Sequence, residues 1–187
     1  GARAREYEDA LQWLVDARLV HKIYRSSAPS LPVAAYDDLS AFKIYLVDVG
    51  LLRRLAQLAP TAFGEGNRLF TEFKGALTEN FVLQSLVTQF EVVPRYWTQS
   101  NPPYEVDFLI QRENDIFPVE VKSDTNTTSK SLKKFKELFP DKVKLRVRFS
   151  LDNLKLDDDV LNIPLFMADE ADRLIGLALE LQNKSKL

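Results

Sequence analysis

Residues 105–122 read EVDFLIQRENDIFPVEVK, and this stretch decides the expected fold. Two runs rich in apolar residues, 104–111 and 116–122, have the alternation of β-strands. The short polar segment 112–115 separates them, as a turn would. We therefore predict a β-hairpin at the centre of the molecule.

The alternation also predicts which side chains share a face. Val106 and Phe108 should lie on the apolar face of the first strand, which leaves Asp107 on the other face. In the second strand Glu120 and Lys122 should lie together on the polar face. The segment between Asp107 and Glu120 is long enough to finish one strand, turn and return, so we expect these two carboxylates to meet across neighbouring strands.

Asp107, Glu120 and Lys122 are suited to metal-assisted chemistry. Two adjacent carboxylates repel unless a cation lies between them, and hard oxygen ligands suit Mg²⁺ or Mn²⁺. Lys122 could orient a metal-activated water and offset the charge that grows on a pentavalent phosphorus. The pattern thus predicts phosphodiester cleavage, with Asp107 and Glu120 as metal ligands. The alternative is a solvated ladder of cross-strand ion pairs.

A third carboxylate, Glu79, falls in a helical pattern upstream of the hairpin. It shares one stripe with Leu83, Leu86 and Phe90, where an acid is costly unless something pairs with it. A functional Glu79 would join the catalytic group. The alternative is a carboxylate at the edge of the stripe, favoured there by the helix dipole.

From residue 75 the chain reads as helix, three strands, helix, strand, which is a mixed α/β pattern. The expected helices span 75–90 and 129–139, and a further strand spans 143–149. Glycines and polar residues at 61–68 mark a boundary, so we predict one domain over 63–187. A strand at 163–167 and a helix at 170–181 should close it.

Residues 1–62 form a smaller unit in this reading. A helix over 5–17 precedes two strand-like runs, 19–24 and 42–47, joined by a loop with two prolines. This order is typical of the trailing half of a winged helix. Asp48 then caps a short helix that ends near Pro60.

Composition excludes several classes of function. The 187 residues contain no cysteine and only one histidine, His21, which excludes disulfide frameworks and thiol catalysis and argues against histidine-rich metal sites. No phosphate-binding glycine loop is present, so this stretch alone should not hydrolyse ATP. No apolar run could span a bilayer and no signal peptide is visible, which predicts a cytoplasmic protein without a membrane partner. The missing initial Met suggests a piece of a longer polypeptide.

The formal net charge of −2 hides a basic segment. Residues 130–148 contain eight basic and two acidic residues, the pattern of a surface that follows a phosphate backbone. The candidate nucleic-acid contacts are Lys130, Lys133, Lys134, Lys144 and Arg146. The alternative is an ordinary solvated, lysine-rich face.

Five separated motifs resemble a known family. They are FKIYLVDVGL (42–51), KGALTENFV (74–82), YW (96–97), EVDFLI (105–110) and PVEVKS (118–123). Together they look like the C-terminal domain of unknown function of predicted bacterial and archaeal AAA-superfamily ATPases. That domain is similar to PD-(D/E)XK restriction-endonuclease-like proteins.

The resemblance implies a mixed sheet with flanking helices that follows an ATPase module and part of a winged-helix-like unit. It matches Asp107 to the acid of the second core strand, Glu120 and Lys122 to the (D/E)-x-K pair, and Glu79 to the helix acid. The eponymous proline is replaced by Val106. Two functions remain open: a Mg²⁺-dependent nuclease acting on DNA, or an inactive nuclease-like module that binds nucleic acid or a partner protein. The apolar stripe of 170–181 could also serve a homo-oligomer.

Overall fold

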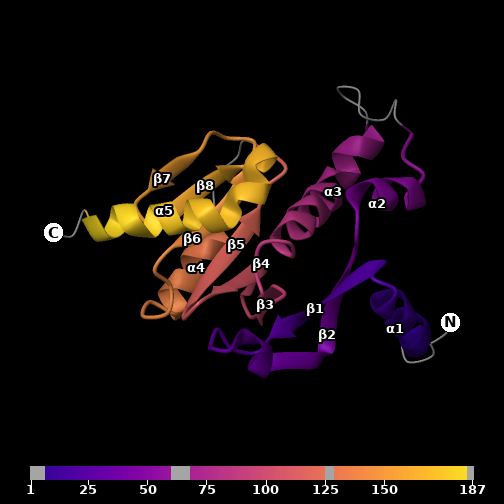
Figure 1. Ribbon diagram of the computed structural model, residues 1–187, viewed down its shortest axis with the longest axis horizontal. Helices are drawn as coiled ribbons and strands as arrows, with labels where there is room; N and C mark the ends of the chain where they lie inside the picture. The colour runs from indigo at the N-terminus through magenta and orange to yellow at the C-terminus, as the bar shows by residue number, and fades with distance from the viewer. Residues whose placement is uncertain (1–6, 60–67, 125–128, 185–187) are drawn as a thin grey trace.

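The computed structural model describes residues 7–59, 68–124 and 129–184. One mixed sheet of eight strands runs through it in the order β2-β1-β3-β4-β5-β6-β8-β7, with helices on its faces (Figure 1). The elements are α1 (Glu8–Asp16), β1 (Val20–Ser26), β2 (Asp37–Leu46), α2 (Val49–Leu55), α3 (Arg68–Leu86), β3 (Arg95–Ser100), β4 (Pro103–Arg112), β5 (Asp115–Val121), α4 (Lys130–Leu138), β6 (Arg146–Ser150), β7 (Lys155–Asp157), β8 (Val160–Pro164) and α5 (Ala171–Lys184).

The predicted hairpin is confirmed at the centre of this sheet. Strands β4 and β5 pair antiparallel from Phe108 opposite Val119 to Arg112 opposite Asp115. After β5 the chain crosses over through α4 and returns as β6, which runs parallel to β5. The mixed α/β class and the flanking helices are therefore as expected.

Two apolar layers cover the two faces of the sheet. On one face, buried side chains of α3 and α5 pack against the strands, among them Leu83, Phe108 and Ile175. On the other face α4 packs through Phe135 against Trp97, with ring centroids 5.1 Å apart. Burial of these layers supplies the main driving force for folding.

A β-bulge in β4 changes the expected side-chain directions. Trp97 pairs with Val106 but Arg95 pairs with Leu109, so β4 carries one extra residue there. Val106 consequently packs in the layer on the α4 side, whereas Phe108 packs in the layer beneath α3. The prediction that these two residues share a face is wrong, because strict alternation fails at a bulge.

The N-terminal elements contribute to the same sheet. The expected helix and two strands are present as α1, β1 and β2, and β1 adds to the sheet by running parallel to β3, with Arg25 beside Tyr96. Asp37 on β2 forms two 2.8 Å contacts with the Arg95 guanidinium on β3. The expected boundary at 61–68 lies largely outside the described residues.

A polar clamp fastens β2 to α3. Buried Asn80 accepts a hydrogen bond from the Leu46 amide (2.8 Å) and donates one to the Leu46 carbonyl (3.0 Å). The Asn80 side chain thus satisfies the strand end as a neighbouring strand would. Asp48 accepts from the Leu51 amide (3.0 Å), which confirms the predicted cap of α2.

Other differences concern element ends. Helix α3 begins at Arg68, earlier than predicted, and the short edge strand β7 was not predicted. The stripe of α5 is partly used by the chain itself, since Leu174 and Ala178 are buried against the sheet. No helix in the described ranges is long and apolar enough to cross a membrane.

Candidate functional site

A cavity of about 280 Å³ lies between α3, the middle of β4 and the end of β5. Its walls combine three elements and the loop after β5. The lining residues are Gly75 and Glu79 of α3, Asp107 of β4, Val121 of β5, and Lys122, Ser123 and Asp124 that follow it. Three of the four predicted catalytic residues, Glu79, Asp107 and Lys122, therefore meet at one cavity.

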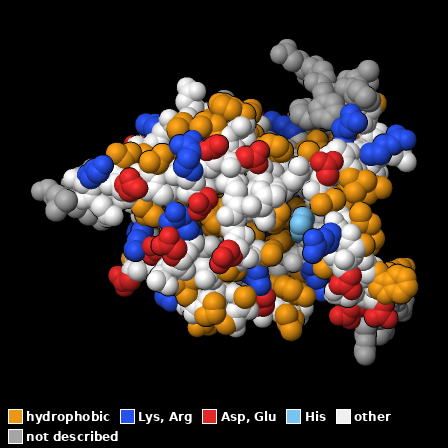
Figure 2. Space-filling model, in the orientation of Figure 1, with side chains coloured by type: hydrophobic (Ala, Val, Ile, Leu, Met, Phe, Trp, Pro, Cys, Tyr) orange, Lys and Arg blue, Asp and Glu red, His pale blue; other side chains and the backbone are white. Residues whose placement is uncertain are grey.

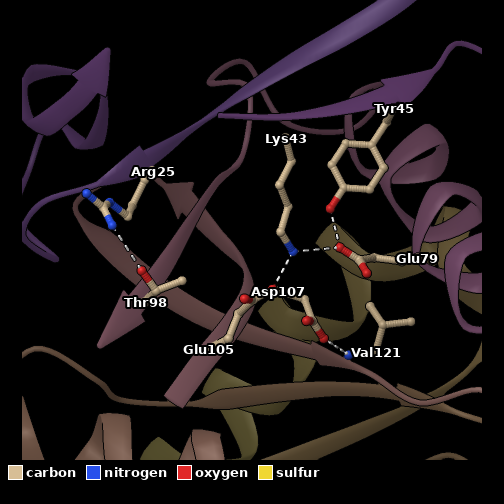
Figure 3. A network of polar contacts seen from close by, with 8 residues as sticks. All are labelled: Arg25, Lys43, Tyr45, Glu79, Thr98, Glu105, Asp107 and Val121. Atoms are coloured by element: carbon tan, nitrogen blue, oxygen red, sulfur yellow. Dashed lines mark hydrogen bonds and ion pairs between the residues drawn. The ribbon is translucent and has the colours of Figure 1, made fainter. Parts of the chain in front are cut away.

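Asp107 reaches this cavity because of the bulge in β4. Its Oδ2 accepts a hydrogen bond from the Val121 amide at 2.7 Å (Figure 3). Burial and the nearby Glu79 carboxylate raise the pKa of Asp107 to about 7, against the opposing effects of the Val121 amide and of Lys43. Burial and the neighbouring carboxylate thus favour the protonated form of Asp107 more than the Lys43 charge opposes it.

Glu79 is held by two side chains of β2. Lys43 Nζ lies 3.1 Å from Glu79 Oε1, and the Tyr45 hydroxyl donates to the same oxygen (Figure 3). Burial and the Glu79 carboxylate raise the pKa of the Tyr45 phenol, so the phenol stays protonated and remains a donor. The cost of an acid on the apolar stripe is met by this pair.

Lys43 also forms an ion pair with Glu105, which lies two positions before Asp107 on β4. Burial lowers the pKa of the Lys43 ammonium, but the carboxylates of Glu79 and Glu105 outweigh burial, and the net effect is a raised pKa. Its ammonium also lies 5.1 Å from the centroid of the Tyr96 ring. Lys43 is therefore a cation fixed among the acids of the site.

Glu120 does not line this cavity. Its neighbours Val119 and Val121 pack in the layer beneath α3, so alternation directs Glu120 to the other face of β5. Its side chain is only 7% exposed, and its Oε1 lies 2.7 Å from Lys122 Nζ. Its Oε2 is buried without a hydrogen-bond partner among the described residues.

The predicted meeting of Asp107 and Glu120 is thus replaced by a meeting of Asp107 and Glu79. Lys43, Tyr45 and Glu105 were not predicted as site residues. Glu105 could have been found, because it lies two positions before Asp107 on the same strand. Lys43 and Tyr45 carry no sequence signal for this role, since only the docking of β2 on α3 brings them close.

Comparison with known proteins divides the chain into two segments. Residues 74–166 match the family model described as Domain of unknown function (DUF4143). Domains of this kind commonly occur with AAA ATPases. Residues 1–62 match the model described as Domain of unknown function (DUF8612). No curated protein and no solved structure matched the chain.

The two matched segments meet at Glu79, which lines the cavity. All four predicted catalytic residues lie within residues 74–166, whereas Lys43 and Tyr45, which hold Glu79, lie within residues 1–62. The surroundings of Glu79 are therefore built from both segments.

The predicted basic surface is reduced by local pairing. Arg146 is only 15% exposed and forms an ion pair with Asp159, and Lys144 lies 2.8 Å from Asp115. Lys134 pairs loosely with Glu137 at 3.4 Å. On the molecular face in Figure 2, basic and acidic side chains are interspersed. Lys130 and Lys133, exposed on α4, remain the strongest of the predicted contacts.

A divalent cation such as Mg²⁺ needs oxygen ligands from the residues around the cavity. Within 7–59, 68–124 and 129–184, no three His, Cys, Asp or Glu side chains form a group that could hold a metal ion. Mg²⁺, however, often takes one or two carboxylates and completes its shell with water and phosphate oxygens. Glu79 and Asp107 line the cavity and have the oxygen donors of such a pair. The buried Oε2 of Glu120, which has no hydrogen-bond partner among the described residues, lies on the other face of β5 and does not contribute to it. The two carboxylates at the cavity are compatible with a hydrated Mg²⁺ or Mn²⁺.

Proposed function

We propose that this chain is the nuclease-like part of a cytoplasmic AAA-type ATPase and that it cleaves DNA phosphodiester bonds with Mg²⁺ or Mn²⁺. The observation that carries the proposal is the cavity itself, where Glu79, Asp107 and Lys122 converge from α3, β4 and the end of β5. The order α3-β3-β4-β5-α4-β6, with β3-β4-β5-β6 as neighbours in the sheet, agrees with a restriction-endonuclease-like core. The frequent association of the matched domain with AAA ATPases supports the ATPase context.

Each residue has a defined task in this proposal. Asp107 and Glu79 line the cavity and would hold the cation, whereas Glu120, on the other face of β5, would act through its contact with Lys122. The cation would supply an activated water and stabilise charge on the phosphate. Lys122 lines the cavity, and its ammonium lies 2.7 Å from Glu120 Oε1. Turned toward the cavity, this ammonium would attract the scissile phosphate.

Lys130 and Lys133 would contact the DNA backbone from α4. Both are exposed in the first turn of α4, which packs on the sheet face opposite α3. Their role is electrostatic and independent of base sequence, because contacts with phosphates carry no sequence information.

The test combines metal binding with cleavage. The full chain is titrated with MnCl₂ in a calorimeter and incubated with labelled single-stranded, duplex and branched DNA in Mg²⁺ or Mn²⁺. We expect wild type to bind the metal and cut, and Asp107→Asn to lose both. Asp115→Asn, at the other end of β5, removes the same charge away from the cavity and should retain both. Cleavage that survives in Asp107→Asn would refute the assignment of the site.

A second function is favoured by one observation. Lys43 and Tyr45 already satisfy Glu79 without any metal, so the domain could be an inactive module that binds nucleic acid or a partner protein for the ATPase. This alternative predicts salt-dependent DNA binding with no turnover and no metal binding in any variant. The same titration separates the two functions.

A further inference from the structure

The site contains a cation of its own, supplied from outside the segment that carries the acids. Glu79, Glu105 and Asp107 all lie within residues 74–166, whereas Lys43 lies within residues 1–62. Strand β2 lies at the edge of the sheet. Its alternation leaves Phe42 and Ile44 exposed and directs Lys43 toward α3 and β4.

A metal ion that binds Glu79 would compete with the Lys43 ammonium for this carboxylate. The ammonium is 3.1 Å from Glu79 Oε1 and pairs with Glu105, and its charge also acts on Asp107. The side chains of Lys43 and Glu79 are each only 25% exposed, so water screens their attraction weakly. A cation that uses Glu79 must therefore replace this ammonium or share the carboxylate with it.

Resting on the function proposed above, we infer that Lys43 is a tethered counter-ion that occupies the carboxylate site, and that a divalent cation binds by displacing its ammonium. Displacement needs only rotation of the Lys43 side chain, which has four flexible carbons. The ammonium stabilises the carboxylates while the metal is absent and weakens metal binding by the same interaction. Exchange between the two cations would then regulate the site.

The chain offers a matched control. Lys22, on neighbouring β1, stacks over the Phe42 ring with 4.3 Å between its Nζ and the ring centroid. In the described part of the chain Lys22 forms no ion pair with the acids of the cavity. Lys43→Met and Lys22→Met therefore remove the same charge and retain the same aliphatic stem, but only the first empties the proposed site.

The first experiment is a calorimetric titration of MnCl₂ into the full chain and these two variants. We expect Lys43→Met to bind Mn²⁺ about tenfold more tightly than wild type, the effect of losing one charge-assisted contact. Lys22→Met should bind like wild type. Equal affinities in all three proteins would overturn the inference and leave the metal site intact. Absence of Mn²⁺ binding in all three, including Lys43→Met, would overturn the proposed function as well.

A second experiment uses only wild type and so does not depend on the folding of a variant. Lysines are reductively methylated with and without saturating MnCl₂, and the modified sites are quantified by mass spectrometry. Displacement of the Lys43 ammonium should increase its labelling at least about threefold, since the released amine gains solvent and loses its ion pairs. Lys22 labelling should not change. Unchanged labelling of Lys43 in a protein that binds Mn²⁺ would show that the metal does not displace it.

Discussion

The hydroxyl of Tyr45, on β2, donates a hydrogen bond to the carboxylate of Glu79, on α3. This contact joins two segments that match different family models, and it lies at the edge of the candidate cavity. The Tyr45 ring also packs against the Phe108 ring, with 5.7 Å between the two ring centroids. One residue of β2 therefore contacts both the apolar layer and the acidic site.

Removal of this hydroxyl should have a modest effect on stability. Tyr45→Phe retains the ring contact with Phe108 but deprives Glu79 of a donor, and hydrogen bonds to charged groups contribute about 1.5–3 kcal/mol. Because Lys43 still pairs with Glu79, we expect a loss near 1.5 kcal/mol in urea denaturation. Tyr24→Phe on β1 is the control. A stability equal to wild type would show that Lys43 alone satisfies the carboxylate.

Asp107 should make stability depend on pH. Its pKa is about 7 in the folded chain, against an ordinary value of 3.8. The folded state therefore retains a proton that the unfolded state loses, so this contribution is complete below pH 4 and is lost as pH rises toward 7. Asp107→Asn should be more stable than wild type by about 2–4 kcal/mol at pH 8 and nearly equal at pH 4.

Urea denaturation of both proteins at the two pH values measures this difference. Asp124→Asn serves as a control, because Asp124 lines the same cavity with its side chain 63% exposed. A constant difference between Asp107→Asn and wild type across this range would contradict the raised pKa.

The Asn80 clamp should be the strongest polar contact between β2 and α3. Asn80→Ala removes both hydrogen bonds to Leu46 and leaves backbone groups without partners at a site that is 1% exposed. We expect a loss of about 2–3 kcal/mol. Hydrogen exchange of the Leu46 amide, measured by NMR, should also be faster in Asn80→Ala, because this amide loses its acceptor.

Gln84 provides the comparison for Asn80. It accepts one hydrogen bond from the Val49 amide at 2.9 Å and is only partly buried. Gln84→Ala should cost about 1 kcal/mol. If both substitutions cost the same, the clamp has no special role in docking β2.

Charge reversal on α4 should weaken DNA binding. Lys130→Glu combined with Lys133→Glu removes two exposed cations, so the slope of log affinity against log salt should fall by about 2 units. Fluorescence anisotropy with labelled duplex DNA at several salt concentrations measures this slope. Lys155→Glu on edge strand β7, also exposed, is the control and should change it little. An unchanged slope in the double variant would place the DNA elsewhere.

Much of the architecture was predictable because local signals agree with the tertiary fold. The hairpin of β4 and β5, the cap at Asp48 and the apolar stripe of α3 follow from alternation, capping chemistry and helical spacing. These signals depend on residues that are close in sequence. Burial of apolar side chains and capping of helix ends favour the same local structure whatever the rest of the fold. The same local patterns predicted the catalytic set of three acids and one lysine, Glu79, Asp107, Glu120 and Lys122.

Only the tertiary structure decided how these residues are arranged. The extra residue of β4 directs Asp107 toward α3, while alternation along β5 directs Glu120 to the other face. Pairing between β3 and β4 determines the bulge, and no local pattern reports it. Lys43 and Tyr45 reach Glu79 across more than thirty positions of the chain. Such contacts depend on the docking of β2 against α3, because long-range electrostatic partners are selected by packing and not by sequence spacing.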